Sequence, residues 1–303
     1  MKKEKHLSHI PVLKEKLIEI LEPQQGQIIV DCTVGAGGHS KAIMKHTNGN
    51  AKIIALDIDS QTIDIAKENL KEYSDNITFI NANFGKIADV LKELNIKSAD
   101  LIYADLGVSS IQLDDKNRGF SFQKAGPLDM RMNINLPKTA ADIINSMKEQ
   151  DLADLIFKYG EEGKSRKIAK LICQARRNSR IESTKQLAQI ICQALGFSSE
   201  KLAKQRIHPA TKTFQALRIA VNNELTNLEK LLENVPEILS SSGRFAVISF
   251  HSLEDRIVKE NFRKNEAAGI YKILTTKPIK PEANEILQNP RARSAKLRAI
   301  QKI

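Results

Sequence analysis

Residues 27–40, QIIVDCTVGAGGHS, join a short apolar run to a glycine-rich turn and then to the start of a helical pattern. The run Gln27–Asp31 predicts a buried strand, and the pattern from Ser40 to Lys45 predicts a helix. Glycines let the backbone turn sharply and approach a ligand closely, while the N-terminus of a helix presents free amide groups. The stretch therefore predicts a ligand-binding turn between a strand and a helix, with a purely structural turn as the alternative.

Apolar runs and helical patterns alternate through the first third of the chain. Further strands are predicted at Lys52–Leu56, Ile77–Ile80 and Asp100–Ala104, with helices at Ser60–Leu70 and Lys86–Leu94 between them. This order predicts a parallel sheet with right-handed crossovers and helices on both faces. Ligands of such sheets bind at the carboxyl ends of the strands.

The pattern changes after Gly107. A long polar loop is expected over 108–137, and helical patterns without strands follow it, which predicts a small helical insert over 138–207. One long amphipathic helix is then expected from Thr211 until Pro236 ends it.

The last part of the chain returns to strand patterns. Strands are predicted at Arg244–Phe250, Tyr271–Thr275 and Ala295–Ile300, with a helix at Leu253–Lys264. The predicted fold class is therefore α/β, with one sheet domain in two parts, 1–137 and 208–303, around an all-helical insert.

Composition places the chain among ordinary globular proteins. It has 303 residues, 41% of them apolar and 27% charged, and no apolar run reaches the roughly 18 to 20 residues that span a bilayer. The start of the chain lacks the apolar stretch of a signal peptide, and the three cysteines show no CxxC spacing. We therefore expect a cytoplasmic protein that has no disulfides, no metal site and no membrane partner.

Basic residues gather in two stretches of the chain. Segment 164–185 holds eight basic residues against one acidic residue, and segment 256–303 holds twelve against four, in a chain of net charge +11. Such zones favour a polyanionic partner such as nucleic acid, because its phosphates are neutralised and counterions are released. Solvated helix faces and a basic tail are the alternative.

The form of the glycine-rich turn bears on the ligand. The turn lacks the G-x-G-x-x-G of dinucleotide enzymes, and Asp31 places a carboxylate at the strand end. A carboxylate there would repel a pyrophosphate but suits the ammonium and sulfonium of S-adenosylmethionine. Asp57 ends the next strand, where a carboxylate can accept both hydroxyls of a ribose, with a helix cap as its alternative role.

The ends of the third and fourth predicted strands add Asn83, Phe84 and Asp105. An aromatic face and a polar acceptor suit an adenine between them. Core packing is the alternative for Phe84.

Several long and unusual strings stand in order along nearly the whole chain. They include HIPVL at 9–13, GAGGHS at 35–40, DLGVSS at 105–110, RGFSF at 118–122, GPLDMRM at 126–132, HPATKTFQALRIAVN at 208–222, SFHSLEDRIVK at 249–259 and NPRARSAKLRA at 289–299. Together they resemble the MraW family, the bacterial ribosomal RNA small-subunit methyltransferases H. One departure is Ile111, where many members have proline.

The resemblance implies a class I, Rossmann-like methyltransferase sheet with an inserted helical substrate-recognition domain. It also implies S-adenosylmethionine as methyl donor and methylation at N4 of a cytidine in the decoding region of 16S rRNA, within the small ribosomal subunit and not on DNA. Carried over position by position, the family's cofactor contacts fall on Gly37, Gly38, His39, Asp57, Phe84, Asp105 and Gln112. The oligomeric state is left open.

Transfer to N4 of cytosine needs help because the lone pair of this amine is delocalised into the ring. An acceptor must hold the N–H groups while the nitrogen attacks the methyl group. Asp105 is the first candidate for this acceptor and Ser109 the second, with a loop-capping role as the alternative for Asp105.

Contacts to RNA are expected from other residues. Phe120 and Phe122 are candidates for stacking on the target base, although they could equally pin the long loop to the body of the protein. His251 and Ser252, just after a predicted strand, could face the same base. Two sets of basic residues are candidates for binding phosphates. They are Arg166, Lys167, Lys170, Arg176, Arg177 and Arg180 in the insert, and Arg291, Arg293, Lys296 and Arg298 near the C-terminus.

Two other function classes fit parts of the sequence. One is an RNA-binding or assembly protein that keeps the fold without the activity, which the intact glycines and carboxylates argue against. The other is a nucleotide-dependent dehydrogenase, which the absence of G-x-G-x-x-G argues against.

Overall fold

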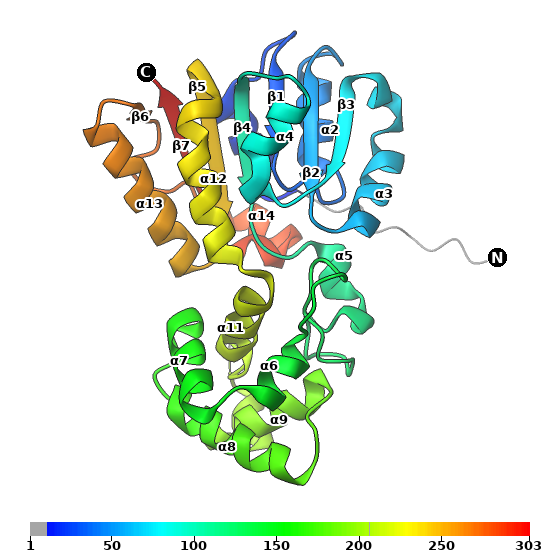
Figure 1. Cartoon of the computed structure of the whole chain (residues 1–303), viewed down its shortest axis with the longest axis vertical. Helices are drawn as coiled ribbons and strands as arrows, with labels where there is room; N and C mark the ends of the chain where they lie inside the picture. The colour runs from blue at the N-terminus through cyan, green and yellow to red at the C-terminus, as the bar shows by residue number, and fades with distance from the viewer. Residues whose placement is uncertain (1–10, 206) are drawn as a thin grey trace, which may run out of the picture. The chain divides into compact units, whose positions relative to one another are not determined.

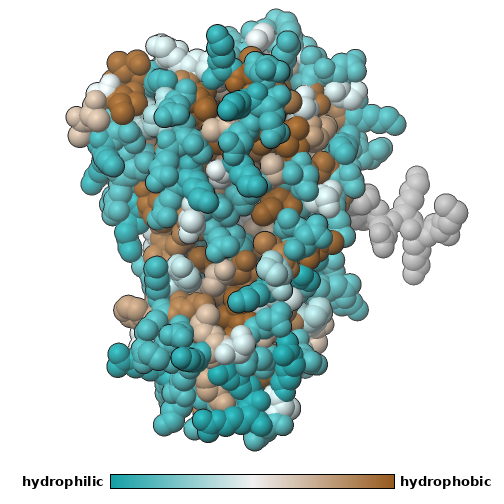
Figure 2. Space-filling view, viewed as in Figure 1, coloured by the Kyte–Doolittle hydropathy of each residue, from teal (hydrophilic) through white to brown (hydrophobic). Residues whose placement is uncertain are grey.

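The computed structural model describes residues 11–205 and 207–303 and divides the chain into two compact units. The sheet unit consists of residues up to Gly107 together with Leu225–Ile303, and the helical unit consists of Val108–Glu224. His9 and Ile10 of the string HIPVL lie outside the described residues. No described helix is long and apolar enough to span a bilayer, and the face of the molecule in Figure 2 is mainly hydrophilic.

The sheet unit is built on seven strands in the order β3-β2-β1-β4-β5-β7-β6 (Figure 1). Their bounds are β1 (Ile28–Asp31), β2 (Lys52–Asp57), β3 (Ile77–Asn81), β4 (Ala99–Asp105), β5 (Leu239–Ser249), β6 (Tyr271–Ile273) and β7 (Lys296–Lys302). Strands β1 to β5 pair in parallel, whereas β7 is antiparallel to both β5 and β6. Every predicted strand is confirmed, and so is the α/β fold class.

Helices cover both faces of this sheet because successive strand residues point to opposite sides. Ile29 belongs to a core with α1 (Lys14–Leu21), α2 (Gly38–His46) and α3 (Ser60–Asn69). The next residue, Val30, belongs to a core with α4 (Ile87–Glu93), α12 (Glu224–Ile238) and α13 (Ser252–Ala267). Helix α14 (Ala283–Gln288) and the 3-10 turns η1 (Lys71–Asn76), η2 (Phe84–Lys86) and η4 (Pro290–Ser294) complete the unit.

The helical unit contains no strand among its described residues. Its elements are α5 (Ser110–Asp114), the 3-10 turn η3 (Lys116–Arg118), α6 (Ala140–Ser146), α7 (Glu149–Gly160), α8 (Ser165–Asn178), α9 (Thr184–Leu195), α10 (Ser199–Ala203) and α11 (Thr211–Asn222). The unit is larger than the insert expected over 138–207. It includes the preceding loop and α11 because Phe120, Leu128 and Met130 share one apolar core with Phe214 and Leu217.

The prediction of one long helix from Thr211 to Pro236 is wrong. Asn223 adopts a left-handed conformation with φ 52° and separates α11 from α12. Asparagine tolerates this conformation better than most residues. Pro236 lies inside the last turn of α12, so it costs a backbone hydrogen bond near the helix end without stopping the helix there.

We expect Gly160→Ala to destabilise the helical unit, because an added Cβ would lie 2.6 Å from the backbone oxygen of Lys212 on α11. Such overpacking typically costs about 1 to 3 kcal/mol. Gly163→Ala is the matched control, since no atom lies within 4 Å of its Cβ position. Thermal unfolding checks the prediction, and equal midpoints for the two variants would contradict it.

Candidate functional site

Four carboxylates follow four neighbouring strands at one edge of the sheet. Asp57 ends β2, Asp31 ends β1 and Asp105 ends β4, while Glu254 stands in the first turn of α13 after β5. The chain proceeds from β1 to β2 on one side and returns to β4 on the other. Such a point of reversal is where parallel sheets bind their ligands, so these carboxylates mark the candidate site.

The Asp31 carboxylate is buried and bonded to protein groups. It accepts hydrogen bonds from Ser40 Oγ at 2.7 Å, Tyr103 OH at 2.6 Å and the Thr33 amide at 3.1 Å. Burial raises its pKa to about 6. These bonds tie α2 and β4 to the end of β1, so Asp31 has a structural role at the site that the sequence did not reveal.

Asp57 links the end of β2 to the glycine-rich turn. Its Oδ2 accepts from the Gly35 amide at 3.0 Å and its Oδ1 from the Asp59 amide at 2.9 Å. Helix α3 is capped by Asp59, whose side chain accepts from Gln61 N, so the helix-cap alternative for Asp57 is wrong. Burial raises the pKa of Asp57 to about 6, and the nearby carboxylates of Asp59 and Asp31 add to the shift.

Packing requires both Gly37 and Gly38. Gly37 has φ 83°, and a Cβ there would lie 2.7 Å from Leu70 Cδ1. A Cβ on Gly38 would collide with the ring of Pro11. The turn therefore has a structural reason for its glycines, and α2 begins at Gly38 with its first amide groups unused by the helix.

Asp105 has one oxygen with no hydrogen-bond partner among the described residues. This atom, Oδ1, is buried, while Oδ2 lies 3.7 Å from His39 Nδ1. The backbone of Asp105 is fixed, because its amide donates to Thr33 Oγ1 at 2.7 Å. Burial raises the pKa of Asp105 well above its usual range, and the charges of Asp31 and Glu254 raise it further.

The protonation of the His39 ring follows from its contact with the backbone. Nε2 lies 2.9 Å from the carbonyl oxygen of Val12, which can only accept, so Nε2 carries a proton. In a neutral ring Nδ1 then carries a lone pair, and it lies 3.7 Å from Asp105 Oδ2. The unpartnered Oδ1 of Asp105 therefore places an acceptor atom at the end of β4, which suits a cation or an N–H donor.

Phe84 begins the turn η2 after β3. Its ring is half-buried and packs against the core that contains α4 and α12. The preceding Asn83 caps the turn by accepting from the Gly85 amide. Core packing thus accounts for one side of the Phe84 ring, and the exposed part stays available for a ligand.

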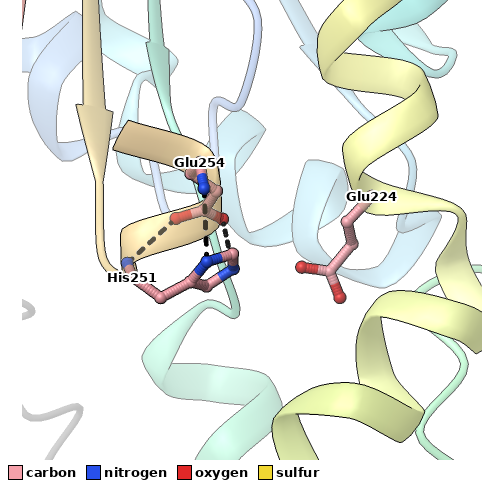
Figure 3. Close-up of side chains that lie close together, drawn as sticks. All are labelled: Glu224, His251 and Glu254. Carbon is pink, nitrogen blue, oxygen red and sulfur yellow. Dashed lines mark hydrogen bonds and ion pairs between the residues drawn. The ribbon is translucent and has the colours of Figure 1, made fainter. Parts of the chain in front are cut away.

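His251 caps helix α13 through an interaction with Glu254 (Figure 3). Its Nδ1 accepts from the Glu254 amide at 3.3 Å, its Nε2 lies 3.1 Å from Glu254 Oε1, and Glu254 Oε2 accepts from the Phe250 and His251 amides. An Nδ1 that accepts a hydrogen bond leaves the ring proton on Nε2. The predicted contact of His251 with a base remains a prediction, beside a capping role that the sequence analysis missed.

Glu254 was also missed, although the chain carries a signal for it. A residue that caps a helix and a glutamate three positions later form the capping-box pattern. The pattern usually begins with Ser or Thr, and here it begins with His251. Glu224, the third residue drawn in Figure 3, belongs to the helical unit, where Arg218 binds its two carboxylate oxygens at 2.8 and 2.7 Å.

Ser109 and Gln112, both in the helical unit, form a capping box at the start of α5. The Gln112 amide donates to Ser109 Oγ and the Ser109 amide donates to Gln112 Oε1, each at 3.2 Å. Ile111, the departure from the family pattern, lies within this helix. The proposed roles of Ser109 and Gln112 stay predictions.

Phe120 and Phe122 pin the long loop to the helical core. Phe120 is 8% exposed, and the half-buried Phe122 packs on His208 and Phe214 with ring centroids 4.4 and 4.9 Å away. This arrangement supports the alternative role given to both residues above. Stacking on a base stays a prediction for Phe122, whereas the Phe120 ring is enclosed.

Several of the basic candidates bind protein groups. Arg176 donates to the backbone oxygens of Ile144 and Met147. Lys296 and the buried Arg298 both bind the Asp255 carboxylate, at 2.9 and 2.7 Å.

Asp255 thus holds both cations within the sheet unit, and this ion pair accounts for the buried Arg298 without a phosphate. A contact of these two residues with phosphates stays a prediction. Arg291 and Arg293 on η4 are exposed, and so is Arg177 on α8, whereas Arg176 is half-buried.

Comparison with known proteins gives consistent matches. Residues 6–303 match the model of the MraW methylase family. Ribosomal RNA small subunit methyltransferase H of Koribacter versatilis is 47% identical over 299 residues, covering 96% of this chain and 93% of its own. The proteins of the same name from Thermotoga neapolitana and Kosmotoga olearia are 45% and 44% identical, and cover 97% and 100% of this chain and 95% and 100% of their own lengths.

The raised pKa of Asp57 makes its contribution to stability depend on pH. The folded protein binds this proton more tightly than the unfolded chain does, so the contribution falls as the pH rises from about 4 to about 6 and is constant above. Asp57→Asn removes the titration. We expect the free energy of unfolding of the variant, relative to wild type, to rise by about 1 to 3 kcal/mol across that window.

Urea unfolding at several pH values measures this difference. Asp75→Asn, at an exposed position of the same unit, is the control for the loss of an acidic residue. A constant difference between Asp57→Asn and wild type from pH 4 to pH 6 would show that the Asp57 pKa is not raised.

Proposed function

Because the chain belongs to the MraW methylase family, we propose that it transfers a methyl group from S-adenosylmethionine to N4 of a cytidine in the decoding region of 16S rRNA. The names of the relatives support small-subunit ribosomal RNA as the substrate. The resemblance of the sequence motifs to the family supports N4 of a cytidine as the methylated atom. Family membership excludes the dehydrogenase alternative. We further propose that the substrate is the RNA in the small ribosomal subunit and that the protein acts in the cytoplasm.

The buried, unpartnered Oδ1 of Asp105 carries this proposal at the level of the site. A buried carboxylate oxygen without a donor costs free energy, and the surrounding Asp31 and Glu254 raise that cost. A ligand that brings a cation or N–H groups to this atom removes the penalty. A pyrophosphate would increase it.

The residues at this edge fit S-adenosylmethionine, whose bound form supplies an electrophilic methyl group. Asp57 would hold the ribose hydroxyls, because each of its oxygens accepts only one backbone amide and has a further lone pair. The exposed part of Phe84 would face the adenine. Gly37, Gly38, His39 and Gln112 are the remaining proposed contacts.

Asp105 would also act on the cytidine amine. Once N4 has formed its new bond it must lose a proton, which the ionised carboxylate of Asp105 would accept. Burial raises the pKa of Asp105 and so makes this carboxylate a stronger base. The fixed backbone of Asp105 keeps the side chain in place during this step, since its amide is bonded to Thr33. Ser109 is the second proposed acceptor.

Methyl transfer from labelled S-adenosylmethionine tests the proposed function. Naked rRNA, small subunits and whole ribosomes are the substrates, followed by mapping of the modified base. We expect label on N4 of one cytidine of the small-subunit RNA. Binding of RNA without any transfer would favour the assembly-protein alternative, and label on another atom would contradict the target.

We expect Asp105→Asn to lower the rate of transfer at saturating S-adenosylmethionine by at least about a hundredfold, because the amide cannot take the proton. Asp89→Asn, at an exposed position on α4, is the control. Circular dichroism confirms that both variants fold. Near wild-type turnover by Asp105→Asn would exclude the catalytic role.

A further inference from the structure

Helix α7 exposes an aromatic side chain that its own unit does not use. Phe157 is 61% exposed, and no other Phe or Tyr among the described residues is in the exposed class. The inner face of α7 is formed by the buried Leu152, Leu155 and Ile156, so the next residue points away from the core. Burial of a phenylalanine stabilises a protein by about 1.5 to 3 kcal/mol. Because Phe157 is mostly exposed, it contributes only a small part of this free energy to the fold.

Basic residues follow Phe157 in the chain, at the end of α7 and the start of α8. Lys158 follows directly, and its Nζ lies 5.2 Å from the centre of the Tyr159 ring. Helix α8 packs against α7 and starts five residues after Gly160. Its exposed residues in the first two turns are Arg166, Lys167 and Lys170.

Arg166, Lys167 and Lys170 form no ion pair among the described residues. Helix α8 contains no acidic residue. Glu162, in the α7–α8 connection, accepts from the Lys164 amide, which directs its carboxylate to the backbone. Arg166 and Lys170 stand one turn apart on the helix, about 6 Å along its axis.

The exposed ring of Phe157 and the cations of α8 together indicate what kind of partner would bind here. A protein or membrane partner would require a broader apolar patch, and Phe157 is the only large hydrophobic residue of the exposed class on α7 or α8. An unpaired nucleotide offers a flat π-face to the ring and a phosphate to the cations. A duplex keeps its base faces stacked and offers only phosphates.

We propose that Phe157, Arg166, Lys167 and Lys170 form a stacking platform, on which one unpaired base of the RNA lies against Phe157 while the neighbouring phosphates contact the three cations. The inference rests on the proposed function only for the identity of the RNA. The platform belongs to the helical unit alone and uses none of the residues assigned above to the cofactor or to the cytidine amine.

The chain contains no tryptophan, so Phe157→Trp introduces a single fluorescent reporter at the platform. We expect a single-stranded oligoribonucleotide to quench its emission, because a stacked base quenches indole fluorescence, and the same sequence as a duplex to quench it much less. Leu287→Trp is the matched control, since Leu287 is 79% exposed on α14 of the sheet unit. Equal quenching by strand and duplex, or equal quenching of both reporters, would overturn the proposal.

Binding affinities provide the second measurement. We expect Phe157→Ala and Phe157→Leu to bind the single strand at least about fivefold more weakly than wild type, and Phe157→Trp to bind as well as wild type. An equal loss for Leu and Trp, or a change in oligomeric state without a change in RNA affinity, would overturn the platform.

Affinity for S-adenosylmethionine and methyl transfer by the wild type are measured in parallel. Absence of transfer by the wild type would contradict the proposed function, whereas unchanged strand binding by Phe157→Ala with normal transfer by the wild type would contradict only the platform.

Discussion

The hydrogen bonds of the buried Asp31 carboxylate hold together the elements on which the candidate site depends. Ser40 brings the first turn of α2 to this carboxylate, and Tyr103 brings β4. The turn that follows Asp31 is thereby fixed, and its next residues contact the neighbouring strand ends: Thr33 accepts from the Asp105 amide and Gly35 donates to Asp57. Without the three donors, Asp31 would be a buried charge of high cost, and the turn would lose its anchor.

The sequence predicted the strands well because each is a short apolar run bounded by turn residues. β1, β2 and β4 have buried residues on both faces, as a parallel sheet with helices on both sides requires. The candidate positions Asp57 and Asp105 were also predictable, since the carboxyl end of a strand is a place that the periodicity defines. The sequence pattern therefore predicts that a residue lies at the end of a strand, but it does not predict which groups its side chain contacts.

The predictions that failed concern features that depend on contacts between distant parts of the chain or on the backbone conformation of a single residue. The apolar stripe continues across Asn223, so periodicity could not show the left-handed residue that separates α11 from α12. Arg176 and Arg177 are adjacent in the sequence, yet only Arg176 is bonded to Ile144 and Met147, residues of another part of the chain. Likewise the charge count near the C-terminus included Arg298, whose partner Asp255 is far away in sequence.

The distribution of charge explains how one basic chain can bind a cation and a polyanion. The net charge of +11 would by itself repel a sulfonium ligand, but at the sheet edge Asp31, Asp57 and Asp105 have no lysine or arginine as an ion-pair partner among the described residues. At physiological salt a charge acts mainly on groups within about 8 to 10 Å, so the side chains close to a ligand count for more than the net charge of the chain. In the proposed function the acidic edge would therefore favour the cationic cofactor, while the exposed cations of α8 would bind RNA phosphates.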